Sequence, residues 1–227
     1  MNKILVLTSL ILMIITITLA TCGNAAQAAL PDLPAAIQDP TLLEAWKQLN
    51  THTEQVMLWD GRSHSGHDLA QFVLEKGIPV EWDAQKVCGS GSCSVLYNQD
   101  GVYVYEDLEP IYINPRLRNR GEISTNLILE AMAHEIYHRM QPYGKVDINL
   151  YEEYTAFYIS THISGATWTN IEAYDPLKPA CLKRWFSDHN LLHGYDGKDP
   201  YIGIDLYPPG IAAVMDDADQ NCPLPGE

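Results

Sequence analysis

The sequence predicts a single α+β domain, in which a short antiparallel sheet comes before two long helices. Extended runs rich in Val, Ile and Tyr lie between residues 78 and 115. Helical segments follow at 124–140 and 149–164. The hydrophobic content of 46% is high enough for a packed core in a chain of 227 residues. We expect this domain to cover residues 41–227.

The first 22 residues predict a signal peptide. Lys3 supplies a positive charge, and residues 4–19 are almost wholly apolar. Cleavage after Ala28 would give a secreted protein. The alternative is a bacterial lipoprotein, because "LATC" resembles a lipobox and would make Cys22 a lipidated, membrane-attached residue. An uncleaved membrane anchor is less favoured, since the apolar run is short for a span. We therefore expect an exported protein, either anchored in the cell envelope or secreted.

The segments before the sheet are a linker and two helices. Residues 23–40 are rich in Ala and Pro and lack an amphipathic period, which predicts a linker. Residues 41–58 place their large apolar side chains near one stripe, as in a helix. A polar turn, "DGRSHSGHD", occupies residues 60–68, and a short helix over 69–77 ends at its glycine.

Three extended runs predict the sheet. The first, "IPVEWDA", covers residues 78–84. The second, "SVLYNQDGVYVYE" at residues 94–106, is a hairpin pattern around an Asp-Gly turn. The third, "PIYINP" at residues 110–115, is rich in Ile and Tyr and bounded by prolines.

The two long helices have clear start and stop signals. Pro142 and Gly144 stop the first, which begins near Ser124. Asn149 and Glu152 form a capping pattern at the start of the second, and Gly165 ends it. Two shorter helices are expected within the Tyr-, Pro- and Gly-rich C-terminal part, at residues 179–192 and 209–219.

The cysteines favour disulfides. Apart from Cys22 the chain has Cys88, Cys93, Cys181 and Cys222, an even number in a chain expected to be exported. We prefer the pairs Cys88–Cys93 and Cys181–Cys222, although four cysteines allow three pairings. A zinc site on these cysteines is disfavoured because no CxxC pair is present.

The net charge of −15 argues against nucleic acid as a partner, because nucleic-acid binding needs a basic surface. It favours solubility without identifying a substrate.

The segment "HEIYH" predicts a zinc site. His134 and His138 are four residues apart and so project from the same face of a helix. Glu135 lies one position further round, where its carboxylate can take a proton from a zinc-activated water. The surrounding helix is apolar on most sides, and buried unpaired His and Glu would be costly. A metal ion that satisfies them is simpler than a chance pattern.

The next helix offers the third ligand. Glu153 shares a helix face with Ala156, which is small enough to let the helices approach. Glu152 is expected to act in the cap with Asn149, so we favour Glu153. His162 is the competing ligand on a different face of the same helix.

"HEIYH" followed by "EEYTAF" resembles the gluzincin type of zincin metallopeptidase, in particular small bacterial metallopeptidase domains. The resemblance covers roughly residues 95–164. It implies a zincin-like fold, one Zn²⁺ held by His134, His138 and Glu153, and Glu135 as the catalytic residue. It also implies a peptide or protein substrate held along an extended strand, either "PIYIN" or the hairpin.

The sequence alone leaves other functions open. The protein could be a non-catalytic envelope-binding protein that keeps the zincin fold, although intact Glu135 argues against this. It could also be a zinc amidase acting on a bond other than a peptide. The oxyanion donor is undecided among Tyr158, His189, His193 and Tyr195. A second metal site in residues 60–68 is a weak alternative.

Overall fold

The computed structural model describes residues 34–82, 92–94, 97–99, 102–104, 109–119, 124–140, 149–165, 171–189 and 222. The predicted signal peptide with Cys22 lies outside these residues, and so do Cys88, His193, Tyr195 and the helix expected at 209–219. None of the described helices is long and apolar enough to cross a membrane.

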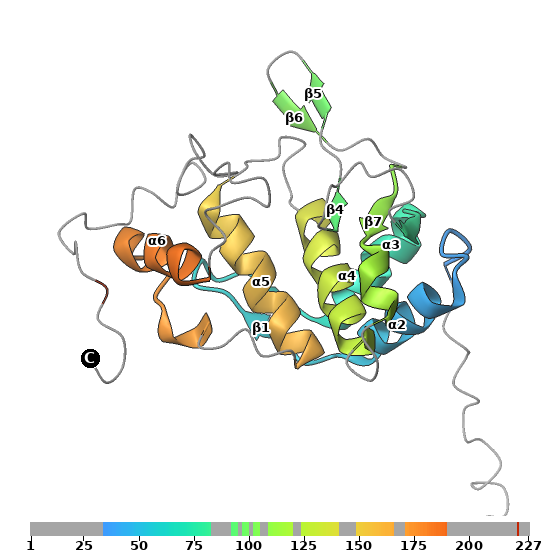
Figure 1. The fold of residues 1–227 in the computed structure, drawn as a ribbon, viewed down its shortest axis with the longest axis horizontal. Helices are drawn as coiled ribbons and strands as arrows, with labels where there is room; N and C mark the ends of the chain where they lie inside the picture. Colours follow the sequence, from blue (N-terminus) through green and yellow to red (C-terminus); the bar gives the residue numbers. More distant parts are fainter. Residues whose placement is uncertain are drawn as a thin grey trace, which may run out of the picture. The chain divides into compact units, whose positions relative to one another are not determined.

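The predicted α+β class is confirmed, since helices and short strands both occur in the described chain (Figure 1). The elements are α2 (Pro40–Thr51), β1 (Val56–Met57), β2 (Ser63–His64), α3 (Gly66–Lys76), β3 (Val80–Trp82), β4 (Cys93–Ser94), β5 (Tyr97–Gln99), β6 (Val102–Val104), β7 (Ile111–Ile113), the 3₁₀ turn η1 (Pro115–Asn119), α4 (Ser124–Met140), α5 (Leu150–Ser164), η3 (Ile171–Ala173) and α6 (Pro179–Asp188).

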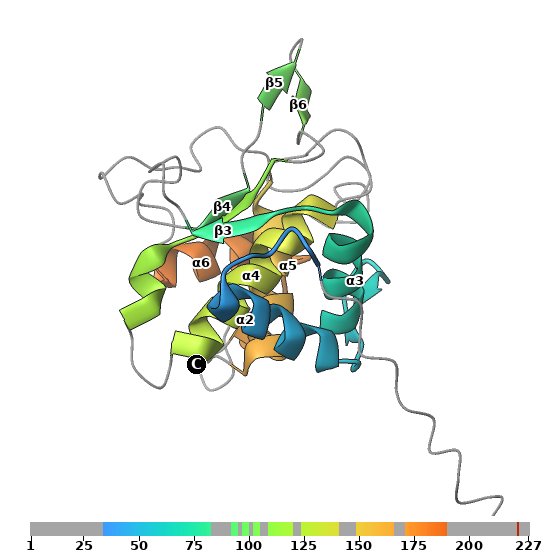
Figure 2. The same ribbon diagram turned by 90° about the vertical axis from the view of Figure 1, so that its right-hand side faces the viewer.

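The main sheet is mixed, whereas the sequence predicted an antiparallel one. Its strand order is β3-β7-β4, with β3 parallel and β4 antiparallel to β7. Val80 pairs with Ile111, and Cys93 pairs with Tyr112. A parallel pair needs a long connection, which the residues between β3 and β7 supply. The helices lie on one side of this sheet (Figure 2).

This topology bears on one of the two predicted substrate strands, and the hairpin stays a prediction. The "PIYIN" strand is β7, and both of its edges are paired within the sheet. The hairpin strands β5 and β6 pair with each other in register from Tyr97–Val104 to Gln99–Val102, and they form a separate sheet. β4 stands at one end of the order β3-β7-β4 and contacts α4.

The folded domain starts before the predicted linker ends. Asp39 caps α2 by accepting hydrogen bonds from the backbone N–H groups of Thr41 and Leu42. Ile37 is 3% exposed and belongs to the main core. The helix ends at Thr51, earlier than expected, and Val56 joins β1 instead.

A close contact joins α2 to α3 at Gly66. A Cβ atom there would lie 2.6 Å from the Leu49 carbonyl oxygen and 2.8 Å from the His52 Cβ. Ser65 and Asp68 form a capping box, so α3 starts inside the segment predicted as a turn. Only glycine therefore fits where these two helices meet.

Helices α4 and α5 match their predictions closely and lie side by side (Figure 1). Asn149 caps α5 by accepting from the backbone N–H of Glu152, and Gly165 ends it at φ 64°. A main core forms where both helices pack with α2, α3, β3 and β7. Because α4 and α5 are buried on most sides, their facing side chains are held rigidly.

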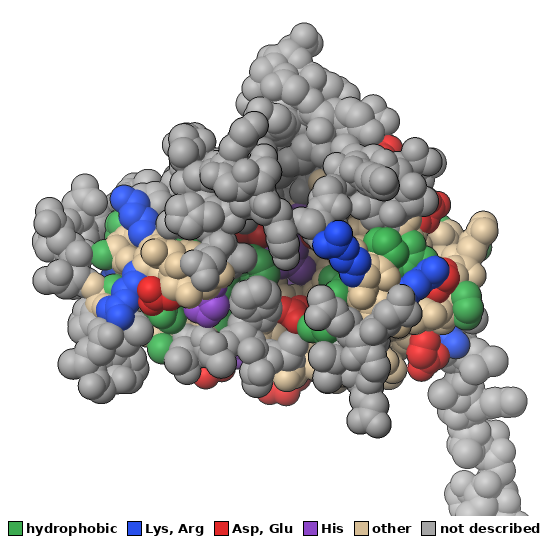
Figure 3. Space-filling model, viewed as in Figure 1, with side chains coloured by type: hydrophobic (Ala, Val, Ile, Leu, Met, Phe, Trp, Pro, Cys, Tyr) green, Lys and Arg blue, Asp and Glu red, His purple; other side chains and the backbone are tan. Residues whose placement is uncertain are grey.

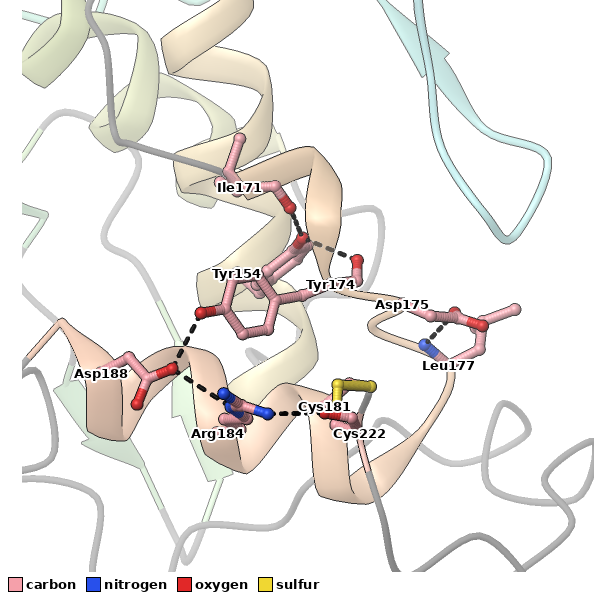
Figure 4. Close-up of a disulfide and its surroundings, with 9 residues drawn as sticks. All are labelled: Tyr154, Ile171, Tyr174, Asp175, Leu177, Cys181, Arg184, Asp188 and Cys222. Atoms are coloured by element: carbon pink, nitrogen blue, oxygen red, sulfur yellow. Dashed lines mark hydrogen bonds and ion pairs between the residues drawn. A yellow bond between two sulfur atoms is a disulfide. The ribbon is translucent and has the colours of Figure 1, made fainter. Parts of the chain in front are cut away.

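A second core packs α6 and η3 against the start of α5. The predicted Cys181–Cys222 disulfide is confirmed, and Arg184 donates to the Cys222 carbonyl oxygen at 2.7 Å (Figure 4). Tyr174 donates to the Asp188 carboxylate at 2.8 Å in the same cluster. Cys93 is also disulfide-bonded, and its predicted partner Cys88 lies outside the described residues.

Candidate metal centre

Antiparallel packing of α4 and α5 brings the predicted ligand residues together. His138, near the end of α4, meets Glu153 near the start of α5. His134 lies one turn before His138 on α4, and Phe157 lies one turn after Glu153 on α5. The rings of His134 and Phe157 pack together, with centroids 4.4 Å apart. The i, i+4 spacing on each helix thus places both rings and the carboxylate on one interface.

The three donor groups converge on one point. The Nε2 atoms of His134 and His138 are 3.1 Å apart. Glu153 places Oε1 3.3 Å from the His134 Nε2 and Oε2 3.1 Å from the His138 Nε2. Among the described residues, these three are the group of His, Cys, Asp or Glu side chains arranged to hold a metal ion.

The three donor groups could hold a metal ion, and their spacing can be compared with that of a zinc site. With metal–ligand bonds of about 2.0–2.1 Å in a tetrahedral site, neighbouring donor atoms lie about 3.4 Å apart. The observed separations of 3.1–3.3 Å are close to that value. Two imidazole lone pairs and a carboxylate facing one another also repel unless protons or a cation lie between them. A single cation bound between them would satisfy all three groups.

The charges at this point are strongly coupled. Burial alone would lower the pKa of His138, but the neighbouring Glu153 carboxylate outweighs it and raises that pKa to about 8. Burial would raise the pKa of Glu153, but His134 and His138 hold it well below its usual range. Without a metal, the centre therefore keeps an anionic carboxylate and tends to bind a proton on His138.

Glu135 lies beside this centre in a buried position, with 7% of its surface exposed. Burial raises the pKa of its carboxyl group, and the positive potential of His134 and His138 opposes this only in part. Ser94 of the edge strand β4 donates from its Oγ to the Glu135 carbonyl oxygen at 3.1 Å. The edge of the sheet and the candidate base are therefore in contact.

Figure 3 shows histidine and acidic side chains near the middle of one face. The side chains of His134, His138 and Glu153 retain 11%, 16% and 21% exposure. The candidate centre is thus largely buried without being sealed, as a site that admits a substrate must be.

Other candidate residues lie elsewhere. His162 is held by the Tyr158 carbonyl oxygen and the Glu172 carboxylate, at 2.8 and 3.0 Å, and takes no part in the centre. The Tyr158 ring packs on Trp59, with centroids 4.5 Å apart. His189 binds the Trp185 carbonyl oxygen at 2.7 Å. The described residues therefore do not single out an oxyanion donor.

The polar segment 60–68 does not form a second metal cluster among the described residues. Asp60 binds Arg62, with 2.7 Å between Oδ2 and Nε, and Asp68 serves the α3 cap. His67 faces the Asn50 side chain at 2.9 Å. Each of these side chains has a structural partner that accounts for its position.

Sequence reasoning missed one set of contacts next to the centre. Tyr137 donates to Glu152 at 2.6 Å, and Arg62 donates to the other oxygen of the same carboxylate at 2.8 Å. Glu152 was expected to complete the capping pattern with Asn149, but its side chain is used here instead. The only sequence signal was that Tyr137 and Glu152 each precede a predicted ligand.

Comparison of the chain with protein-family models, with curated proteins and with solved structures returned no match.

Proposed function

We propose that this protein is an exported zinc-dependent metallopeptidase of the gluzincin type. The observation that carries the proposal is the convergence of His134, His138 and Glu153 beside the buried carboxyl group of Glu135. Two histidines one helical turn apart and a carboxylate from another element leave a fourth position open on zinc. A site used only for structure would not need an acid–base group at that position.

In this proposal zinc and Glu135 have different roles in peptide-bond hydrolysis. Zinc, when bound, would polarise the scissile carbonyl and lower the pKa of a water molecule. Glu135 would accept a proton from the attacking water and donate it to the nitrogen of the leaving amine. Burial supports this role, because a carboxyl group with a raised pKa holds and returns a proton near neutral pH more readily than an exposed one.

The substrate in this proposal is an extended peptide bound along β4. β4 stands at one end of the strand order β3-β7-β4. Ser94 in this strand contacts the backbone of Glu135, so a peptide added to that edge would pass close to the candidate base. Backbone hydrogen bonds to a sheet edge hold peptides with little dependence on their sequence.

Metal content and peptide cleavage test the proposal together. We expect wild-type protein to bind about one zinc and to cleave members of a peptide library. Glu135→Gln should keep the zinc and lose cleavage, because the amide cannot accept the proton. His134→Ala should lose both the metal and the activity.

His162→Ala is the matched control, because this histidine lies on α5, the helix of Glu153, but binds Glu172 instead. It should keep zinc and activity. The peptidase proposal is wrong if Glu135→Gln cleaves as well as wild type. Stoichiometric zinc without cleavage of any peptide would favour the binding-protein alternative.

A further inference from the structure

We propose that Tyr137, Glu152 and Arg62 form a positioning bridge, which fixes how α4 and α5 are rotated relative to each other at the metal centre. The inference rests on the metal centre of the proposed function and is independent of the reaction carried out there. It gives a role to Arg62, in the polar segment between β1 and β2, and to the carboxylate of Glu152.

The first step is the position of the bridge along the helices. Tyr137 immediately precedes His138 on α4, and Glu152 immediately precedes Glu153 on α5. The hydroxyl of Tyr137 donates to the Glu152 Oε2 at 2.6 Å. The bridge therefore joins the same two helices as the ligand pair, one residue away on each.

The second step is helix geometry. Successive residues on an α-helix point about 100° apart, so the bridge and the donor atoms occupy adjacent faces of each helix. A rotation of either helix about its axis that separates His138 from Glu153 must also stretch the bond between Tyr137 and Glu152. Because Tyr137 is 1% exposed and tightly packed, its hydroxyl cannot follow such a rotation freely.

The third step is charge. Glu152 is 7% exposed, and a buried carboxylate needs a partner. Arg62 supplies it, with Nη2 at 2.8 Å from the Glu152 Oε1. Asp60 holds the same guanidinium, at 2.7 Å between its Oδ2 and the Arg62 Nε. Asp60, which lies with Arg62 in the connection between β1 and β2, therefore holds the guanidinium in place.

These contacts also separate the two neighbouring glutamates. Both oxygens of Glu152 are engaged by Tyr137 and Arg62. The oxygens of Glu153 face His134 and His138. The bridge therefore keeps one carboxylate away from the cation and leaves the other aimed at it. Loss of the bridge should loosen the metal geometry without removing any ligand.

Cobalt binding tests this inference, because tetrahedral Co²⁺ reports its geometry by visible absorption and needs no substrate. The protein is freed of metal and titrated with Co²⁺, and its stability is measured by urea unfolding in parallel. The variant is Tyr137→Phe, which removes only the bridging hydroxyl. We expect the Co²⁺ affinity of this variant to fall about tenfold, the smaller end of the loss seen when a residue that orients metal ligands is removed. The visible absorption band of bound Co²⁺ should also change.

Tyr154→Phe is the matched control. Tyr154 is also a buried tyrosine, adjacent to Glu153, but its hydroxyl donates to the carbonyl oxygens of Ile171 and Tyr174. Its loss should lower the free energy of unfolding by an amount similar to that of Tyr137→Phe and leave Co²⁺ affinity within twofold of wild type. The double variant Tyr137→Phe/Glu152→Ala should bind Co²⁺ no more weakly than Glu152→Ala alone, because Glu152→Ala already removes the acceptor of the Tyr137 hydroxyl.

The outcomes separate this inference from the proposed function. Unchanged Co²⁺ affinity and spectrum in Tyr137→Phe, with wild type binding normally, would overturn the bridge and leave the peptidase proposal standing. Equal weakening by Tyr154→Phe would also overturn it, since the effect would then follow stability alone. Wild type that binds neither Co²⁺ nor Zn²⁺ would overturn the metal centre itself. Wild type that binds metal but cleaves nothing would overturn only the peptidase.

Discussion

The coupling of His138 to Glu153 predicts a steep dependence of zinc affinity on pH. Zinc binds the neutral imidazole, so a bound proton must leave first. Burial of His138 lowers its pKa, but the Glu153 carboxylate outweighs this effect and raises the pKa of His138 to about 8. Zinc affinity should therefore fall as the pH drops below about 8.

The pKa of about 8 sets the size of the effect. About half of the His138 rings are neutral at pH 8 and about 1% at pH 6, which lowers the apparent zinc affinity about 50-fold. An imidazole with the ordinary pKa of about 6.5 would lower it only about fourfold over the same range. Proton uptake by another ligand would steepen the fall further.

Two measurements check this prediction. Zinc affinity is measured at pH 6 and pH 8 by competition with a chelator whose own pH dependence is known. The titration of the His138 ring in metal-free protein is followed by NMR, with its signal assigned from a His138→Gln variant. In metal-free Glu153→Gln the pKa of His138 should return to about 6.5 or below, because burial is then less opposed. A wild-type pKa at or below about 6.5, or an affinity change under about fivefold, would refute the electrostatic coupling.

Three further predictions concern the scaffold, each measured by urea unfolding. Gly66→Ala should lower the unfolding free energy by about 1–3 kcal/mol, because the added methyl has no room; an unchanged midpoint would refute the close contact. Replacing Cys181 and Cys222 with alanine opens a loop with a sequence separation of 41 and should cost about 4 kcal/mol. Retention of full stability would mean that the loop is held by other contacts. Asn149→Ala removes the acceptor for the Glu152 N–H and should cost about 1 kcal/mol, whereas a neutral effect would show that the cap is dispensable.

The two central helices were predictable because their signals are local. Capping by Asn149 and termination at Gly165 depend on residues within one turn of the helix end. The pairing of His134 with His138 follows from helix periodicity alone. Glu153 could be favoured over Glu152 from its position on the helix face, and the structure places it against both histidines.

The rest of the fold depends on contacts between distant segments. Strands β1 and β2 have two residues each, too few to show an alternating pattern. The parallel pairing of β3 with β7 is decided by how the chain crosses back, which composition does not encode. Arg62 and Glu152 are 90 positions apart, so nothing local indicates their ion pair.

The same limit explains why "PIYIN" was offered as one of two substrate strands although it is central in the sheet. "PIYIN" has the apolar composition of any buried strand, and composition does not distinguish a central strand from an edge strand. Its central position follows from its two partners in the fold: Val80 of β3 pairs on one side and Cys93 of β4 on the other. The two-residue strand β4 had no sequence signal of its own beyond its place before the hairpin.

X-ray absorption at the zinc edge tests the central claim most directly. For zinc-loaded wild type, we expect one zinc with two imidazole nitrogens and oxygen ligands at about 2.0–2.1 Å. Glu153→Gln should weaken zinc binding and alter the oxygen shell. Zinc without histidine ligands in wild type, or an identical spectrum and affinity in Glu153→Gln, would contradict the metal centre.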